Sequence, residues 1–258
     1  MSVDSMMPRP PSVPSAPPYH PTRRAWLRGL AGSLGSAVGF APAVFDVDSA
    51  WAAEGSAAAA ADDKPEILAL QPLGEQLPDE QVALVRQALG AFYDYEVQLL
   101  PRVAVPKAAY YAPRKRYRAE KILDELVNDR PDAARFVLGL TAVDISTTKG
   151  KVFDWGVLGL ANIAGTACVI STFRTTRGAS SALHAQQRFA KTAVHEIGHN
   201  LGLPHCPNRG CLMEDGQGSV FTTDHEFDLC ADCRAKLAKS GAKLTTGGSI
   251  PWPEPGSR

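Results

Sequence analysis

The sequence predicts an α/β fold, in which a mixed twisted sheet packs on one backing helix and one long helix, with a small C-terminal subdomain. Short apolar segments typical of strands occur at residues 67–72, 97–105, 136–145, 159–161 and 167–173. Helical periodicity follows the first strand and returns over residues 181–201. Strands with one early helix between them, followed by a long helix, are typical of layered α/β domains.

The backing helix is predicted to begin at Pro78. Its apolar residues recur at intervals of three and four, so one face can pack on a sheet: Val82, Val85, Leu89 and Phe92. The strand after it, 97–105, contains Pro101, which indicates a sheet edge or a bend. We expect the basic cluster Arg114–Arg118 to open a short helix that continues to Val127.

Acidic residues interleave with basic ones along that short helix, which favours a solvated face over a nucleic-acid site. The whole chain carries 27 basic and 27 acidic residues. This balance gives no sign of a protein that binds nucleic acid or a membrane surface.

The long helix is expected to bury one stripe of residues and to present a different face to a cleft. The buried stripe consists of Ala190, Val194, Ile197 and Leu201. His195 and His199 then stand one helical turn apart on the face that looks into the cleft. The apolar face and the histidine face are therefore separate.

Residues 195–205 read H-E-x-x-H-x-x-G-x-x-H. Gly202 can adopt the left-handed conformation that ends a helix, so the reversed chain brings His205 back toward His195 and His199. Three neutral imidazoles with an open fourth position form a catalytic zinc site, and Glu196 is the candidate general base for its water. The alternative, surface histidines that bind no metal, would require the whole pattern to arise by chance.

Four cysteines follow the third histidine in two close pairs, C-x4-C and C-x2-C: Cys206, Cys211, Cys230 and Cys233. This spacing is typical of a closed, structural tetrahedral zinc site. Disulfides are the alternative in an oxidising compartment, unless zinc occupies the thiolates before export. The fifth cysteine, Cys168, lies in an apolar segment and is interpreted as a buried strand thiol.

The extended histidine motif that runs into four cysteines and a methionine resembles the archaemetzincins, a metzincin family. The resemblance covers residues 195–233 and implies a metzincin-like fold with two zinc ions per chain. It implies a catalytic zinc on His195, His199 and His205, with Glu196 as general base. It also implies a structural zinc on the four cysteines and a methionine turn at Met213 beneath the catalytic site.

The function predicted from these residues is zinc-dependent hydrolysis of peptide bonds. In metzincins a peptide or protein substrate lies extended along the edge strand of the sheet, for which residues 156–161 are the candidate here. A zinc-stabilised binding protein with little turnover and a metal hydrolase of non-peptide amides remain as alternatives. Retention of Glu196 argues against the first, because a purely structural metal needs no base.

The N-terminal segment resembles a twin-arginine export signal. Arg23 and Arg24 are followed by Trp26 and Leu27, then by a weakly apolar run and by the small-x-small sequence at residues 50–52. We expect export in folded form to the periplasm or the outside, without stable membrane insertion after cleavage. A membrane anchor and a flexible tail are the alternatives, and the protein stays cytoplasmic if the segment is not used.

The predicted division of the chain is an export signal at 1–52, a linker at 53–64, a metallopeptidase domain at 65–242 and a disordered tail at 243–258. The linker and the tail are rich in small and polar residues. His184 and His225 lie outside the motif and are interpreted as surface or capping histidines.

Overall fold

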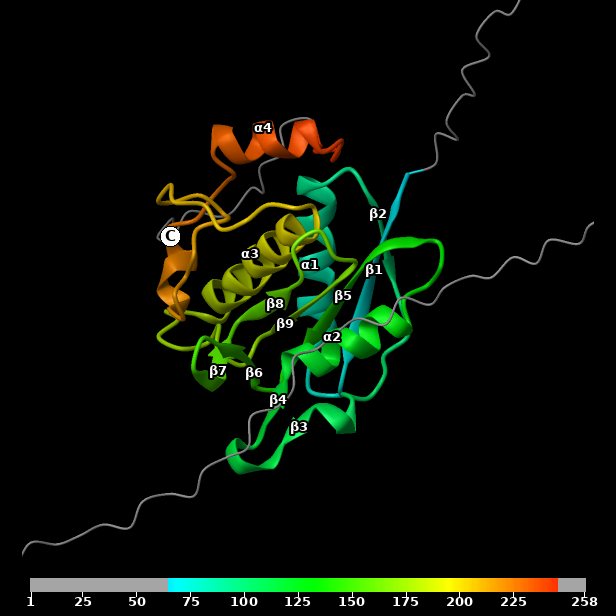
Figure 1. The fold of residues 1–258 in the computed structure, drawn as a ribbon, viewed down its shortest axis with the longest axis vertical. Coiled ribbons are helices and arrows are strands. Elements are labelled where there is room, and N and C mark those ends of the chain that lie inside the picture. The colour runs from blue at the N-terminus through cyan, green and yellow to red at the C-terminus, as the bar shows by residue number, and fades with distance from the viewer. Residues whose placement is uncertain (1–64, 246–258) are drawn as a thin grey trace, which may run out of the picture. The chain divides into compact units, whose positions relative to one another are not determined.

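The computed structural model describes residues 65–245 (Figure 1). The predicted export signal at 1–52 and linker at 53–64 lie outside the described residues, as does the chain from residue 246 onward. No helix within 65–245 combines the length and the apolar character that a membrane crossing requires.

A five-stranded mixed sheet forms the centre of the domain, in the order β2-β1-β5-β9-β8. Four strands run parallel and the last, β8, runs antiparallel to β9. The strand bounds are β1 Ile67–Leu73, β2 Glu96–Leu99, β5 Ala134–Thr141, β8 Gly159–Ala161 and β9 Ala167–Ser171. All residues of β9 are buried, as expected for a strand covered on both faces.

Helices cover both faces of this sheet. The backing helix α1 (Asp79–Phe92) and the long helix α3 (Ala182–Asn200) lie beside the sheet (Figure 1). They share one core with side chains of β1, β5 and β9. Helix α2 (Ala119–Asn128) packs on the opposite face, where Ala69, Val137 and Val169 point toward it. Alternate residues of each strand thus serve two different cores, and the predicted α/β fold is confirmed.

A second, four-stranded sheet lies beside the first, in the order β3-β4-β6-β7. Its strands are β3 Tyr110–Tyr111, β4 Arg116–Arg118, β6 Ile145–Lys149 and β7 Val152–Val157, and the short 3-10 helices Lys107–Ala109 and Ala112–Arg114 flank β3. The strand predicted at 136–145 ends at Thr141, whose hydroxyl donates to the Leu73 carbonyl. The hairpin β6–β7 was not predicted, because β6 (ISTTK) is mostly polar and β7 (VFDWGV) does not alternate between apolar and polar residues.

Two expectations about the first half are wrong. Strand β2 ends at Leu99, because Pro101 cannot donate to a ladder, so the strand predicted at 97–105 is short. The cluster Arg114–Arg118 opens no helix, since residues 116–118 form β4 and α2 begins at Ala119. The solvated face is confirmed for Arg114, Lys115 and the charged residues of α2 such as Asp124, whereas Arg118 is 6% exposed and Arg116 pairs with Asp144 at 3.1 Å.

The C-terminal subdomain packs against the end of α3. It contains the 3-10 helix η3 (Val220–Asp224) and the helix α4 (Ala231–Lys239). Beyond α4, Leu244 pairs with Tyr93 and the Thr245 N–H donates to the Phe92 carbonyl. The ordered chain therefore continues past residue 242 and returns to the C-terminal end of α1.

Candidate active site and metal centres

Helix α3 positions the first two histidines. Its N-cap, Ser181, accepts a hydrogen bond from the His184 N–H, and its predicted buried stripe is buried as expected. The helix ends at Asn200, and Gly202 follows with a φ of 95°, a conformation that side chains with a Cβ rarely adopt. The Leu203 N–H donates to the Gly198 carbonyl, which completes the reversal that leads to His205.

The structure brings the three motif histidines together. One ring nitrogen from each of His195, His199 and His205 lies within 4.8 Å of the others. Burial, and then the proximity of His199, lowers the pKa of His195 to about 3, and burial also lowers the pKa of His199. Both rings are therefore neutral near pH 7, which is the form that binds a metal.

This donor set fits a zinc ion. The Nδ1 atoms of His195 and His199 lie 2.6 Å and 2.7 Å from the backbone carbonyls of Leu212 and Leu203. Those carbonyls fix the tautomer with the proton on Nδ1 and leave Nε2 as a ligand atom. Three neutral nitrogen donors that converge on one point, with a cleft on the fourth side, match the composition of a catalytic zinc site.

Glu196 is 6% exposed and lies beside the histidines at the bottom of the cleft. Burial raises its pKa to about 8. The edge strand passes very close to it, because a Cβ atom at Gly159 would lie 2.5 Å from Glu196 Oε1. Only a glycine in β8 leaves the carboxylate in this position.

The four clustered cysteines also come together. Cys206 Sγ lies 3.7 Å from Cys230 Sγ, and Cys211 Sγ lies 3.8 Å from Cys233 Sγ. A tetrahedron with metal–sulfur bonds of about 2.3 Å has edges of about 3.8 Å, whereas a disulfide is about 2.05 Å long. The sulfur spacing is therefore that of a zinc tetrathiolate, and the structure contains these residues as free cysteines.

Nearby N–H groups donate hydrogen bonds to sulfur atoms of this cluster, although burial still raises the pKa of Cys211. The Asn208 side-chain amide donates to Cys230 Sγ at 3.3 Å, and the Cys230 N–H donates to Cys211 Sγ at 3.4 Å. Burial opposes the Cys230 thiolate, but the hydrogen bond from Asn208 and those from neighbouring cysteines lower its pKa to about 6. The cluster thus has the donors that a structural site uses around its sulfur ligands.

Met213 is fully buried and packs against the last turns of α3, at Gly198. Its sulfur lies so close to α3 that a Cβ atom at Gly198 would be 2.5 Å away. Its carbonyl accepts the Cys206 N–H, which links the turn to the cysteine cluster. The motif pattern leaves residue 198 unspecified, so the need for glycine there follows only from the packing of Met213.

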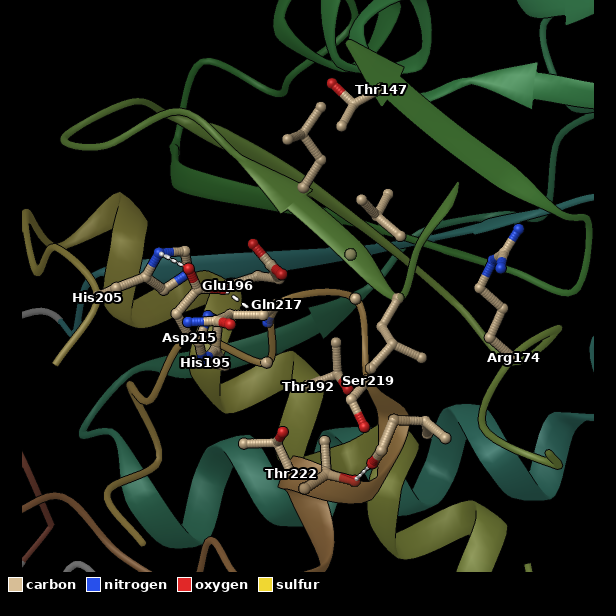
Figure 2. Close-up of a pocket in the computed structure, with 18 of the residues that line it drawn as sticks. Thr147, Arg174, Thr192, His195, Glu196, His205, Asp215, Gln217, Ser219 and Thr222 are labelled. Carbon is tan, nitrogen blue, oxygen red and sulfur yellow. Dashed lines mark hydrogen bonds and ion pairs between the residues drawn. The ribbon is translucent and has the colours of Figure 1, made fainter. Parts of the chain in front are cut away.

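A cleft of about 360 Å³ runs across the histidines and Glu196. Figure 2 shows His195, His205 and Asp215 at one end and Arg174 at the other. Strand β8 borders the cleft and is the last strand of its sheet. The Ser171 N–H bonds to the Leu158 carbonyl, so by antiparallel alternation the backbone groups of Gly159 and Ala161 face the open edge.

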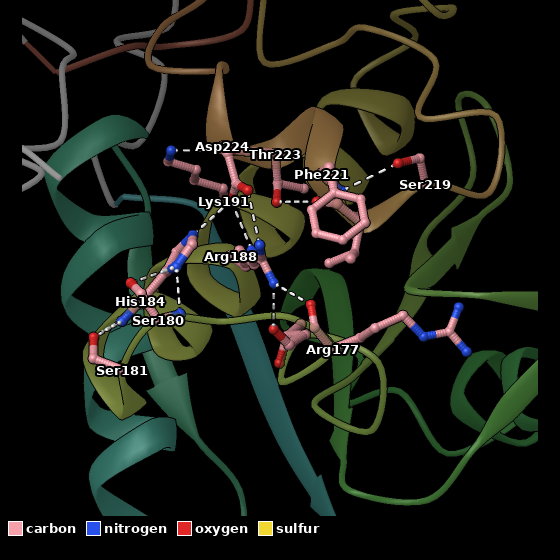
Figure 3. Close-up of polar contacts among 12 residues, drawn as sticks. Arg177, Ser180, Ser181, His184, Arg188, Lys191, Ser219, Phe221, Thr223 and Asp224 are labelled. Carbon is pink, nitrogen blue, oxygen red and sulfur yellow. Dashed lines mark hydrogen bonds and ion pairs between the residues drawn. The ribbon is translucent and has the colours of Figure 1, made fainter.

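The cleft wall opposite β8 is fixed by a buried arginine of α3. Arg188 is 1% exposed and holds both oxygens of Asp224 in η3, each at 2.7 Å (Figure 3). Its other amino group donates to the carbonyls of Thr175 and Arg177 in the loop before α3. His184, interpreted from the sequence as a surface or capping residue, also contacts Asp224, because its Nε2 lies 2.7 Å from Asp224 Oδ1.

Several residues that line the cleft lie outside the histidine motif and were not predicted from the sequence. Asp215 lies near His205, and Lys149 and Trp155 reach the cleft from the hairpin β6–β7. Gly150 between two segments with strand composition was the one local signal for this hairpin. Cys168 is fully buried in β9, as predicted, and His225 is exposed.

Comparison with known proteins identifies the family. The family model of peptidase family M54 matches residues 82–239. The archaemetzincin of Archaeoglobus fulgidus is 34% identical over 168 residues, which cover 65% of this chain and 96% of the relative. The archaemetzincin of Halobacterium salinarum strain R1 is 31% identical over 170 residues, which cover 63% and 94%.

Solved structures agree. The crystal structure of the Archaeoglobus fulgidus archaemetzincin complexed with malonate superposes with a TM-score of 0.56 at 33% identity, covering 66% of this chain and 99% of that one. The Methanopyrus kandleri archaemetzincin superposes with a TM-score of 0.60 at 27% identity, covering 68% and 95%. The chain therefore belongs to peptidase family M54, the archaemetzincin family, and is a zinc metallopeptidase.

Proposed function

We propose that this metallopeptidase cleaves peptide bonds with a catalytic zinc ion on His195, His199 and His205 and with Glu196 as its general base. The observation that carries the proposal is the convergence of three ring nitrogens within 4.8 Å beside a buried carboxylate that faces the same cleft. Zinc, when bound there, acts as a Lewis acid that lowers the pKa of a water molecule to about 7 and polarises a carbonyl.

Glu196 moves the proton in this scheme. Its carboxylate takes a proton from the attacking water while the water oxygen bonds to the scissile carbonyl carbon. The protonated Glu196 then gives that proton to the departing amine as the C–N bond breaks, so the carboxylate is restored. The buried position of Glu196 beside Gly159, in the same cleft as the three histidines, suits a group that must accept and return one proton.

The substrate binds as an added strand in this proposal. The outward backbone groups of Gly159 and Ala161 can pair with an extended peptide, which would place its carbonyl above the histidines. The sequence-based candidate, 156–161, spans the end of β7 and all of β8, and both segments line the cleft. Main-chain pairing gives affinity without selecting side chains.

The proposal includes a second, structural zinc ion on Cys206, Cys211, Cys230 and Cys233. The tetrahedral sulfur spacing and the N–H donors around the sulfurs support it. This site would hold together the segment after α3 and the start of α4, which supply its four sulfur ligands.

Export in folded form remains part of the proposal and rests on Arg23, Arg24 and the small residues at 50–52. These lie outside the described residues. If the segment is used, zinc must occupy the thiolates in the cytoplasm before oxidation can pair them. A chain in which the segment is not used would act in the cytoplasm.

Metal removal and restoration tests the proposal. The purified protein is incubated with a diverse peptide mixture, and new peptide ends are identified by mass spectrometry. Cleavage should stop after brief chelation and return with zinc, and His199→Ala should show none. Cleavage that survives chelation, or that persists in His199→Ala, would rule out the proposed site. Metal analysis of the same sample should give two zinc ions per chain.

A further inference from the structure

The three histidines differ in what holds their second ring nitrogen. His195 and His199 are oriented by the backbone carbonyls of Leu212 and Leu203, at 2.6 Å and 2.7 Å from Nδ1. Leu203 lies just beyond the end of α3, and Leu212 lies between Cys211 and Met213; both residues are buried. The main chain therefore orients the rings of His195 and His199, and their orientation depends little on other side chains.

His205 is held differently. Its side chain is 48% exposed, and its Nδ1 lies 3.9 Å from Asp215 Oδ2 (Figure 2). Within residues 65–245, no backbone carbonyl accepts a hydrogen bond from this ring at the distance seen for the other two. The distance to Asp215 is that of an ion pair and is longer than a hydrogen bond. A small rotation of the exposed His205 ring can shorten this distance to that of a hydrogen bond.

Asp215 is anchored on its other side. Its Oδ1 accepts the Gln217 N–H at 2.8 Å, and Lys149 Nζ of β6 lies 4.0 Å from the same oxygen. The Asp215 side chain is 38% exposed, but its hydrogen bond to the backbone holds the carboxylate in the loop, whereas the His205 ring has no hydrogen bond of this kind within the described residues. The fixed partner in this pair is therefore Asp215, and the adjustable one is His205.

We infer that Asp215 is the positioning residue of the third metal ligand: its carboxylate accepts the Nδ1 proton of His205 and turns Nε2 toward the other two imidazoles. The inference rests on the proposed role of the three histidines as ligands. Carboxylate partners of ligating histidines fix the ring and raise its basicity, and their loss costs about 10- to 100-fold in metal affinity. The histidine motif does not specify residue 215, so this support comes from the loop after Met213.

The test compares Asp215→Asn with Glu214→Gln in the purified full chain. Glu214 is the matched control, because it is the adjacent carboxylate in the same loop, and its Oε2 accepts the Gly210 N–H at 2.7 Å. Metal affinity of the histidine site is measured by chelator competition with zinc. Asp215→Asn should weaken it about 10- to 100-fold, whereas Glu214→Gln should leave it unchanged.

Cobalt(II) in the histidine site supplies a readout that general destabilisation would not move. The d–d absorption of Asp215→Asn should shift toward that of His205→Ala, while Glu214→Gln keeps the wild-type spectrum. Wild-type affinity and spectrum in Asp215→Asn would overturn the inference, as would equal losses in both carboxylate variants. A wild-type protein with no exchangeable metal would instead contradict the proposed function.

Discussion

Arg188 in the active-site helix donates two hydrogen bonds of 2.7 Å each to the carboxylate of Asp224 in the facing 3-10 helix. The arginine is 1% exposed and also donates to two carbonyls of the loop before α3. One side chain thus connects the helix that carries two histidines to both segments of the cleft wall. Planar, bidentate geometry makes such a pair strong and directional.

Asp224→Ala should therefore destabilise the domain strongly. It leaves the Arg188 guanidinium buried with no carboxylate, and breaking a buried pair from one side costs about 3–5 kcal/mol. Denaturant unfolding measures the loss. Asp132→Asn, which removes an exposed acid far from α3 in sequence, is the control and should unfold as the wild type does. A loss below about 1 kcal/mol, the value of surface pairs, would show that the contact is not held in solution.

The same pair should make stability depend on pH. Burial opposes the charge of Asp224, but hydrogen bonds from Arg188 and His184 hold its pKa below the usual range. A depressed pKa in the folded state contributes stability above the unfolded value of about 3.9, and this contribution is lost as the pH falls through the folded value. The stability gap between wild type and Asp224→Asn should be constant from pH 7 to about 5 and should shrink below about 4. A gap that stays constant down to pH 3 would contradict this.

Gly159→Ala should impair turnover without removing metal. Its Cβ would lie 2.5 Å from Glu196 Oε1, so the carboxylate must shift. A displacement of about 1 Å in a catalytic group can cost about 100-fold in rate. Gly90→Ala is the control, because a Cβ there meets open space and α1 gains stability by about 0.5–1 kcal/mol. Full activity in Gly159→Ala would show that Glu196 tolerates the crowding.

Cys230→Ser should abolish the proposed structural zinc site on the four cysteines. The variant is expected to lose one zinc ion and to unfold at lower temperature or to give little soluble protein, because a structural zinc supplies folding free energy. Cys168→Ala removes a thiol outside the cluster and should keep both zinc ions. Metal analysis and thermal unfolding of the two variants separate the sites, and an unchanged Cys230→Ser would remove the structural zinc from this account.

The sequence predicted strands for the central sheet, both helices of the shared core, and two separate groups of candidate ligands, one of three histidines and one of four cysteines. It did so because His195 and His199 lie on one helix, Gly202 reverses the chain, and strands such as β9 are continuously apolar. Residues whose roles depend on partners far away in the sequence could not be identified from the sequence alone. Arg116 has the pattern of a surface cation until Asp144 and Asp154 fold against it, and the hairpin β6–β7 is held by strand pairing that the periodicity of its sequence does not report.

Comparison of wild type with Glu196→Gln tests the central claim most directly. Both proteins are assayed for zinc content and for cleavage of a diverse peptide mixture under the same conditions. Because Glu196 is proposed as a base and not as a ligand, the variant should keep both zinc ions and lose about 100- to 10,000-fold in cleavage rate. Cleavage at the wild-type rate by Glu196→Gln, or no cleavage by the zinc-loaded wild type, would contradict the account.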